Sequence, residues 1–416
     1  MAACGKNKVS ATENRSGRDQ SLGSAFKKHF SQFFEVRPER LHFTAHSHHP
    51  WPNVSRQAHL SAWEDANDLA DSKWERIFGE VIPRSRGHLA RILGLSDPES
   101  IVFAPNTHEF VVRILSCFEK APVRILTTGS EFHSFARQRC RWEESGQVEC
   151  VEVPTEPFET FPARFAAAAE KHTFDLIFLS RVFFDSGFAA DAVSELLNAV
   201  GPKEPWIVLD GYHEFMARPT SLGELEDRCF YLAGAYKYAM SGEGACFLHC
   251  PSGYGPRPVN TGWFAGFGAL EDGAMAKEIP YAEGGQRFAG ATVDPTAFYR
   301  FNAVMDLWEN EGLSVDAIHG HVRSLQGRFL EQLASAKVSN LSPEELVPGA
   351  EIAERGNFLT FRTNKAGEIS ERLESEQVMT DFRGDRLRFG FGIYHDESDI
   401  DALMPRLVRA LSEVSR

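Results

Sequence analysis

The sequence predicts an α/β fold in which a mainly parallel seven-stranded sheet carries helices on both faces and a smaller α+β domain follows it. Seven short apolar runs recur between residues 101 and 248, and helical segments separate several of them. Strands and helices that alternate at this spacing need crossover connections, which produce parallel sheets covered on both faces. After about residue 300, apolar residues recur at helical spacing and only short strand-like runs remain.

Most of the seven runs are continuously apolar, which is typical of strands buried on both faces. The run at 148–153 instead alternates apolar residues with Glu149 and Glu152, so we expect it near an edge of the sheet. The predicted strands are Ile101–Ala104, Val123–Leu126, Val148–Val153, Phe174–Leu179, Trp206–Leu209, Cys229–Leu232 and Ala245–Leu248.

Helical patterns lie between the strands and after them. Behind Ser314, a predicted N-cap, apolar residues from Val315 to Leu333 repeat at helical spacing. The other predicted helices are Glu109–Cys117, Phe158–Lys171, Ala190–Val200 and Ile400–Leu411, with short strands at Phe358–Arg362 and Leu387–Phe391. We expect a disordered tail at 1–24, a segment at 25–55 that contributes to the small domain and the active site, a large domain at 56–298 and a small domain at 299–416.

Composition excludes several classes of partner. The 416 residues include 44 Lys and Arg against 58 Asp and Glu, and the net charge of −14 disfavours nucleic acids and anionic membranes. No apolar run approaches the roughly 20 residues that cross a bilayer. The seven cysteines are scattered without a CxxC pair, which disfavours disulfides and zinc. We therefore expect a soluble, cytoplasmic protein with no metal, no nucleic acid and no membrane partner.

Polar residues follow the predicted strands at the sheet edge where ligands of open parallel sheets bind. Asn106, Thr107 and His108 open a helix, whose free N–H groups suit an anion such as phosphate. This pattern predicts a phosphorylated cofactor. The segments after later strands are Ser130–Ser134, Phe184–Gly187, Asp210–His213 and Gly234–Tyr238.

Asp210 and Lys237 carry the most chemical information. A lysine at a strand end flanked by Tyr236 and Tyr238 is desolvated, which lowers its pKa and suits Schiff-base chemistry. An aspartate that ends the preceding strand can keep a pyridine nitrogen protonated and make the ring an electron sink. Taken separately, Asp210 could be a turn residue and Lys237 a solvated strand end.

The order of these motifs resembles the class V branch of pyridoxal-phosphate (PLP) enzymes of fold type I, and within it kynureninase. Asp210-Gly-Tyr-His213 resembles the family's Asp-x-x-His, and Tyr236-Lys237-Tyr238 resembles its Tyr-Lys-Tyr segment. Gly262-Trp263-Phe264, Arg287–Thr292 and the later Arg386-Leu-Arg388-Phe-Gly also match family segments. The resemblance covers about residues 98–300 and returns at Arg388.

The resemblance implies a role for each matching residue. Lys237 forms the internal aldimine, Asp210 binds the pyridinium nitrogen, His213 lies near the phenolic oxygen and Phe132 stacks on the ring. Arg388 pairs with the substrate α-carboxylate, and Tyr236 is a candidate for a second proton transfer. The remaining cofactor contacts that it implies are Thr107, Tyr236, Trp263 and, from the other subunit, Thr292. We also expect His108 and Asp185 to contact the cofactor because they follow predicted strands, although relatives have other polar groups at the position of Asp185.

The resemblance implies hydrolytic Cβ–Cγ cleavage of an amino acid through aldimine and quinonoid intermediates, in a homodimer with a shared active site. An aminotransferase, β-lyase or epimerase remains an alternative, as does an inactive scaffold, although a scaffold predicts loss of Lys237 or Asp210. A cysteine desulfurase needs a cysteine on a loop well beyond the lysine, whereas the last cysteine here is Cys250.

Four histidines at 42–49 depart from the family pattern and leave the substrate open. They could form a loop that contacts the substrate through His46, Ser47 and His48, a metal cluster, or an ordinary turn. Arg388 could likewise be a strand-edge ion pair, and Phe132 and Trp263 could be core aromatics.

Overall fold

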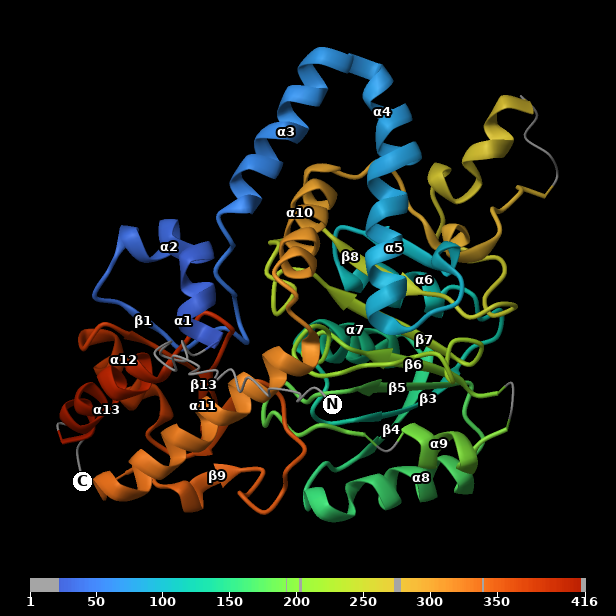
Figure 1. The fold of residues 1–416 in the computed structure, drawn as a ribbon. Helices are drawn as coiled ribbons and strands as arrows, with labels where there is room; N and C mark the ends of the chain where they lie inside the picture. The colour runs from blue at the N-terminus through green and yellow to red at the C-terminus, as the bar shows by residue number, and fades with distance from the viewer. Residues whose placement is uncertain (1–21, 192, 202–203, 273–277, 339, 413–416) are drawn as a thin grey trace, which may run out of the picture.

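The computed structural model describes residues 22–412 except 192, 202–203, 273–277 and 339, and its centre is a seven-stranded sheet (Figure 1). The strand order is β2-β8-β7-β6-β5-β3-β4. β8 runs antiparallel to both neighbours, and the other pairings are parallel. The strands are β2 (Ile101–Ala104), β3 (Val123–Thr128), β4 (Val148–Val153), β5 (Leu176–Ser180), β6 (Trp206–Asp210), β7 (Cys229–Gly234) and β8 (Cys246–His249).

This sheet confirms the predicted fold class, and all seven predicted strands are present with ends shifted by two residues or fewer. The alternating strand β4 pairs with β3 alone and forms an edge, as its pattern predicts. Its exposed glutamates face solvent, whereas every residue of β5 and β7 is buried.

Helices cover both faces of the sheet. Ile177, Leu179, Ile207 and Leu209 pack with residues of α5, α8, α9 and α10 on one face. The intervening strand residues, such as Phe178, pack with residues of α6 and α7 on the other. These helices are α5 (Ile82–Leu93), α6 (Thr107–Leu115), α7 (His133–Glu144), α8 (Phe161–Lys171), α9 (Val193–Ala199) and α10 (Thr296–Asn310).

The N-terminal segment lies beside the C-terminal part of the chain. Residues 1–21 of the predicted tail lie outside the described residues, and α1 begins at Leu22. The segment contains α1 (Leu22–Lys27), α2 (Ser31–Val36) and β1 (Leu41–His42), and β1 pairs in parallel with β11 (Val378–Met379). α3 (Val54–Leu69) and α4 (Lys73–Arg76) then form an arm that projects above the sheet in Figure 1.

The C-terminal part is a smaller α+β unit built on a four-stranded antiparallel sheet of order β12-β13-β10-β9. Apolar residues of its helices, including Val322, Phe329 and Leu407, form a separate core with Phe43 of the N-terminal segment. The elements are α11 (Val315–Ala336), β9 (Leu346–Val347), β10 (Phe358–Arg362), α12 (Ala366–Ser375), β12 (Asp381–Arg383), β13 (Arg386–Gly390) and α13 (Glu397–Ser412). Ser314 caps α11, as predicted, by accepting a hydrogen bond from the Ala317 N–H at 3.1 Å.

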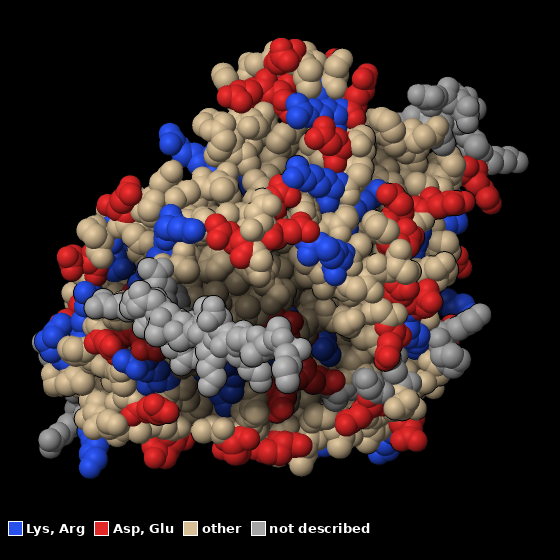
Figure 2. All heavy atoms as spheres, viewed as in Figure 1, with Lys and Arg blue, Asp and Glu red and all other residues tan. Residues whose placement is uncertain are grey.

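Basic and acidic side chains are interspersed over the face that Figure 2 shows. In the part of the chain that the structure describes, none of the helices has the length and apolar character that a membrane span requires.

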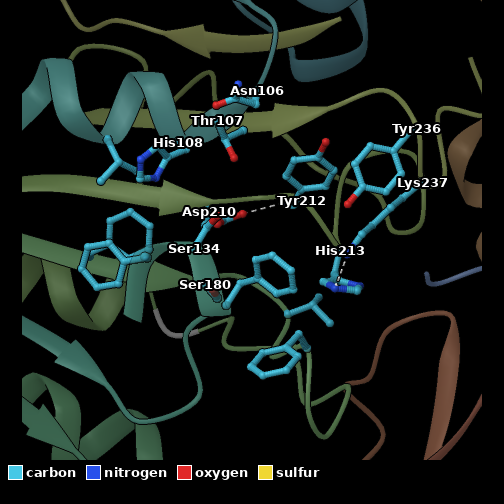
Figure 3. A pocket seen from close by; sticks show the side chains of 16 residues that line it. Asn106, Thr107, His108, Ser134, Ser180, Asp210, Tyr212, His213, Tyr236 and Lys237 are labelled. Atoms are coloured by element: carbon cyan, nitrogen blue, oxygen red, sulfur yellow. Dashed lines mark hydrogen bonds between the residues drawn. The ribbon is translucent and has the colours of Figure 1, made fainter. Parts of the chain in front are cut away.

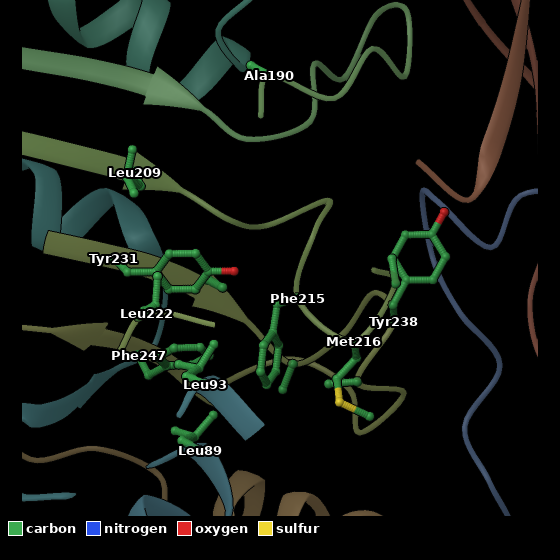
Figure 4. Packing of buried hydrophobic residues seen from close by; sticks show 14 of the residues in the cluster. Leu89, Leu93, Ala190, Leu209, Phe215, Met216, Leu222, Tyr231, Tyr238 and Phe247 are labelled. Carbon is green, nitrogen blue, oxygen red and sulfur yellow. The ribbon is translucent and has the colours of Figure 1, made fainter. Parts of the chain in front are cut away.

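The apolar core beneath the C-terminal ends of the strands packs Tyr231, Phe215 and Phe247 against Leu89 and Leu93 of α5 (Figure 4).

Candidate active site

A cavity of about 190 Å³ lies at the carboxyl ends of β5 and β6, beside the N-terminus of α6 (Figure 3). Ser180 and Asp210 are the last residues of these two strands, and Lys237 follows the end of β7 by three residues. The lining residues are Asn106, Thr107, His108, Val111, Phe132, Ser134, Phe135, Phe178, Ser180, Val182, Phe184, Asp210, Tyr212, His213, Tyr236 and Lys237. The cavity thus joins seven of the predicted site residues: Thr107, His108, Phe132, Asp210, His213, Tyr236 and Lys237.

Lys237 is buried with its amine in an aromatic surround. Its Nζ lies 2.5 Å from His213 Nε2 and 5.3 Å from the centroid of the Tyr212 ring. Burial, and then the charge of Arg388, lower the pKa of Lys237 to about 7. The pKa of His213 also falls well below its ordinary value because of burial and the neighbouring lysine, so a neutral imidazole accepts from the amine. The Nδ1 atom of His213 is buried without a hydrogen-bond partner.

Asp210 lies between Lys237 and α6 in the cavity (Figure 3). Its Oδ1 accepts a hydrogen bond from the Tyr212 N–H at 2.9 Å, and burial raises its pKa to about 6. Gly234 makes room for this loop, because a Cβ atom there would lie 2.1 Å from the Tyr212 hydroxyl oxygen. A carboxylate in such surroundings favours a cationic partner from the cavity.

The N-terminus of α6 forms the opposite end of the cavity. Asn106 caps the helix through its Oδ1, which accepts from the Glu109 N–H at 3.1 Å. Thr107 and His108 follow in the first turn, and all three line the cavity. Free N–H groups at this end, together with the helix dipole, provide a site for an anion such as phosphate.

Sequence reasoning missed Ser180, which lines the cavity, whereas Ser134 and Tyr212 lay in predicted strand-end segments but were given no role. Ser180 is the polar residue that directly ends an apolar strand, which is the signal that could have found it. Its hydroxyl donates to buried Glu131 at 2.5 Å, and burial raises the pKa of Glu131 to about 8. Thr128, the last residue of β3, also donates to Glu131, so this carboxyl group links the ends of β3 and β5.

Arg388 is buried in the small domain, outside the cavity lining. Its Nε donates to Asp381 Oδ1 at 2.9 Å and its Nη2 donates to Oδ2 of the same carboxylate. His46 Nε2 lies 2.8 Å from Asp381 Oδ1, so two of the four predicted substrate contacts, Arg388 and His46, share one partner. Asp381 carried no signal in the sequence, because its role depends on the cross-strand pairing of β12 with β13.

The remaining predicted site residues are not part of the cavity lining. His48 is exposed at its rim, where its ring stacks on Tyr236 with centroids 5.1 Å apart. The Ser47 backbone closes a turn onto Thr44, and Asp185 accepts from the Ser130 hydroxyl at 2.9 Å. Trp263 and Thr292 are both exposed and do not line the cavity.

The N-terminal histidines do not converge on a shared point among the described residues. His42 pairs with Tyr394, His46 with Asp381 and His49 with the Pro50 carbonyl. A different group, made of His88, Asp306 and Glu309, has ligand atoms within 4.8 Å of one another. Arg84 and Arg91 already pair with its two carboxylates, which disfavours a cation there.

Comparisons with known proteins show what the sequence is similar to. A family described as kynureninase C-terminal domain matches residues 321–407. Kynureninase of Deinococcus radiodurans is 26% identical over 271 residues, which are 64% of this chain and 62% of that protein. The matched region therefore spans less than two thirds of that relative.

Solved structures of PLP enzymes share the fold. A mutant of C-DES with glycine covalently linked to the PLP cofactor has a TM-score of 0.76 at 16% identity, covering 92% of this chain and 98% of that chain. Apo cysteine desulfurase from Thermococcus onnurineus has a TM-score of 0.75 at 16% identity, with 91% and 96% coverage. The chain therefore has the fold of the class V pyridoxal-phosphate-dependent enzymes and is similar in sequence to kynureninase.

Proposed function

We propose that the protein is a PLP-dependent enzyme that acts on an amino acid, and that its reaction is hydrolytic cleavage of a Cβ–Cγ bond, as in kynureninase. The observation that carries the proposal is the buried Lys237, whose pKa is lowered to about 7 in a cavity that also holds Asp210 and the start of α6. The similarity to kynureninase supports the narrower reaction.

The donor set of the cavity fits PLP. Lys237 supplies the amine for a Schiff base, Asp210 a carboxylate for the ring nitrogen, and the α6 N-terminus with Thr107 a site for the phosphate. The unpartnered, buried Nδ1 of His213 is a polar atom that the protein alone leaves unsatisfied. The bound cofactor supplies an electron sink for the negative charge that develops on the substrate α-carbon.

The chain's own residues then bind the substrate and move its protons. With the cofactor and substrate bound, the Lys237 Nζ would be the group to take the α-proton, because a pKa near 7 leaves much of the amine unprotonated at neutral pH. Asp210 would hold a protonated ring nitrogen, whose positive charge would favour the ionised form of the carboxylate. Burial raises the pKa of Tyr236 to about 12, which keeps its hydroxyl protonated as a donor for a later step.

Transamination, β-elimination and epimerisation are the competing reactions, because they use the same lysine and aspartate. Sulfur transfer through a nucleophilic cysteine is disfavoured. None of the cysteines among the described residues lines the cavity, and burial raises the pKa of the nearby Cys246 thiol to about 12. The likeness to cysteine desulfurases is one of fold at 16% identity.

Replacement of Lys237 tests the cofactor assignment. The purified protein, loaded with PLP, is expected to absorb visible light through its Schiff base, and Lys237→Ala is expected to lose that band. Lys28→Ala is the matched control, because Lys28 is an exposed lysine paired with Glu311 on the surface. A Lys237→Ala protein that keeps the absorbance of the wild type would refute the assignment.

A substrate panel tests the reaction. L-kynurenine and 3-hydroxykynurenine are expected to release anthranilate-type products and alanine, measured by fluorescence and chromatography. Keto-acid formation that depends on an amino-group acceptor, with no release of anthranilate, would instead identify an aminotransferase. Pyruvate and ammonia from a β-substituted amino acid would identify a β-lyase.

A further inference from the structure

Asp381 and Arg388 form an ion pair across the small-domain hairpin, in which the Arg388 side chain is buried and that of Asp381 is 17% exposed. They are direct partners in the antiparallel pairing of β12 with β13. The Asp381 carboxylate accepts two hydrogen bonds from one edge of the guanidinium, which is formed by Nε and Nη2. Arg388 is 3% exposed, so its charge depends on this partner.

His46 holds the same carboxylate from the N-terminal segment. It is fully buried, its ring stacks on Phe358 with centroids 4.8 Å apart, and burial lowers its pKa to about 4. Because a carboxylate only accepts, the neutral ring donates its Nε2–H to Asp381 Oδ1. Burial opposes ionisation of Asp381, but the hydrogen bonds from His46 and Arg388 hold the pKa of Asp381 well below its ordinary value.

The free end of the guanidinium reaches the cavity wall. Arg388 Nη1 donates to the Phe184 carbonyl oxygen at 2.5 Å, and Phe184 lines the cavity. The charge of Arg388 also contributes to the lowered pKa of Lys237. A guanidinium has five N–H groups, of which these contacts use three, so Nη1 and Nη2 each keep one N–H for a further acceptor.

We propose that Asp381, oriented by His46, is a positioning residue that holds Arg388 by its Nε edge and leaves the remaining Nη1 and Nη2 N–H groups for the substrate α-carboxylate. The inference rests on the proposed function and on the role that the family resemblance implies for Arg388, which is to bind that carboxylate. Without Asp381, the buried guanidinium would carry an unpaired charge and could take several orientations. Preorganisation of this kind lowers the cost of ordering the site when substrate binds.

Binding calorimetry on the PLP-loaded protein tests the proposal with two pairs of probes. L-alanine is compared with ethylamine, and L-kynurenine with kynuramine, because each amine lacks only the α-carboxylate. Asp381→Asn is expected to lower the preference for the amino acid roughly tenfold, since losing one partner of a buried charge pair weakens recognition by at least that factor. A general structural defect would weaken both members of a pair alike.

Two further variants sharpen the comparison. His46→Gln removes the imidazole while Asp381 stays charged, so we expect a smaller loss of preference, about threefold. Asp385→Asn is the matched control, because Asp385 lies on the same hairpin and pairs with Arg386 at 3.3 Å, with its side chain 54% exposed. Its preference for amino acids is expected to equal that of the wild type.

Each outcome decides the proposal. A folded Asp381→Asn protein that keeps the wild-type preference, or that binds the amino acids more tightly, overturns it; the second result would mean that Asp381 competes with the carboxylate. If Asp381→Asn fails to fold, an unchanged preference in His46→Gln overturns it. If the wild type binds neither amino acid more tightly than the matching amine, the role of Arg388 is refuted as well. If it prefers L-alanine to ethylamine but does not prefer L-kynurenine to kynuramine, only the proposed reaction is refuted.

Discussion

The pKa of the Lys237 amine lies far below that of an ordinary lysine because the amine is buried and the positive charge of Arg388 acts on it. Only the unprotonated amine attacks an aldehyde, so the rate at which cofactor-free protein forms a Schiff base with PLP should rise with pH. We expect the midpoint of that rise near pH 7, against about 10.4 for an exposed lysine. Stopped-flow absorbance between pH 6 and 9 measures it.

Arg388→Gln provides the control for this prediction. The positive charge of Arg388 opposes protonation of Lys237, so its removal should move the midpoint to higher pH. A wild-type midpoint near pH 10 would contradict the prediction, and an unmoved midpoint in Arg388→Gln would leave burial as the only cause.

Residues that end apolar strands were predictable, whereas residues that act through distant partners were not. Asp210 and Lys237 follow recognisable strands, and the cavity contains both. Arg388 matched a motif, but its partner Asp381 becomes visible only through the register of β12 and β13. The 335-residue separation of His46 from Asp381 similarly exceeds anything that local patterns encode.

The sequence pattern predicted most strands and helices because the spacing of apolar residues follows which side of each element is buried. The apolar runs of β5 and β7 are buried throughout, and the alternating run of β4 lies at the edge. The sequence did not indicate that β8 is antiparallel, because a continuous apolar run is the same for a parallel and an antiparallel buried strand. The short strands β1 and β11 also escaped prediction, because each is only two residues long.

The caps of α6 and α11 allow a matched test at the scale of the helix. Asn106 and Ser314 each accept a hydrogen bond of 3.1 Å from a backbone N–H three residues later. Replacing either with alanine is expected to lower the free energy of unfolding by about 1 kcal/mol, measured by urea denaturation. Only Asn106→Ala should also weaken PLP binding, by roughly fivefold, because only α6 begins in the cavity. Equal PLP affinities of the Asn106→Ala variant and the wild type would argue against a phosphate site at α6.

At the scale of the whole molecule, two predicted cofactor contacts are left on the surface of the single chain. Trp263 is 46% exposed, and so is its neighbour Phe267, at a centroid distance of 5.3 Å. Thr292 is exposed as well. A homodimer in which each chain lends Thr292 to the other's site would give these residues a ligand and a partner surface.

Mixing two inactive variants tests this shared site. Lys237→Ala removes the Schiff-base amine, and Thr292→Asp places a negative charge where a phosphate would bind. In a mixed dimer, one site takes Lys237 from the Thr292→Asp chain and Thr292 from the Lys237→Ala chain, so that site is intact. Random exchange of subunits should therefore restore roughly a quarter of the wild-type sites, measured by visible absorbance and turnover. Light scattering that finds a monomer with tightly bound PLP, or a mixture that stays inactive after proven exchange, would exclude the arrangement.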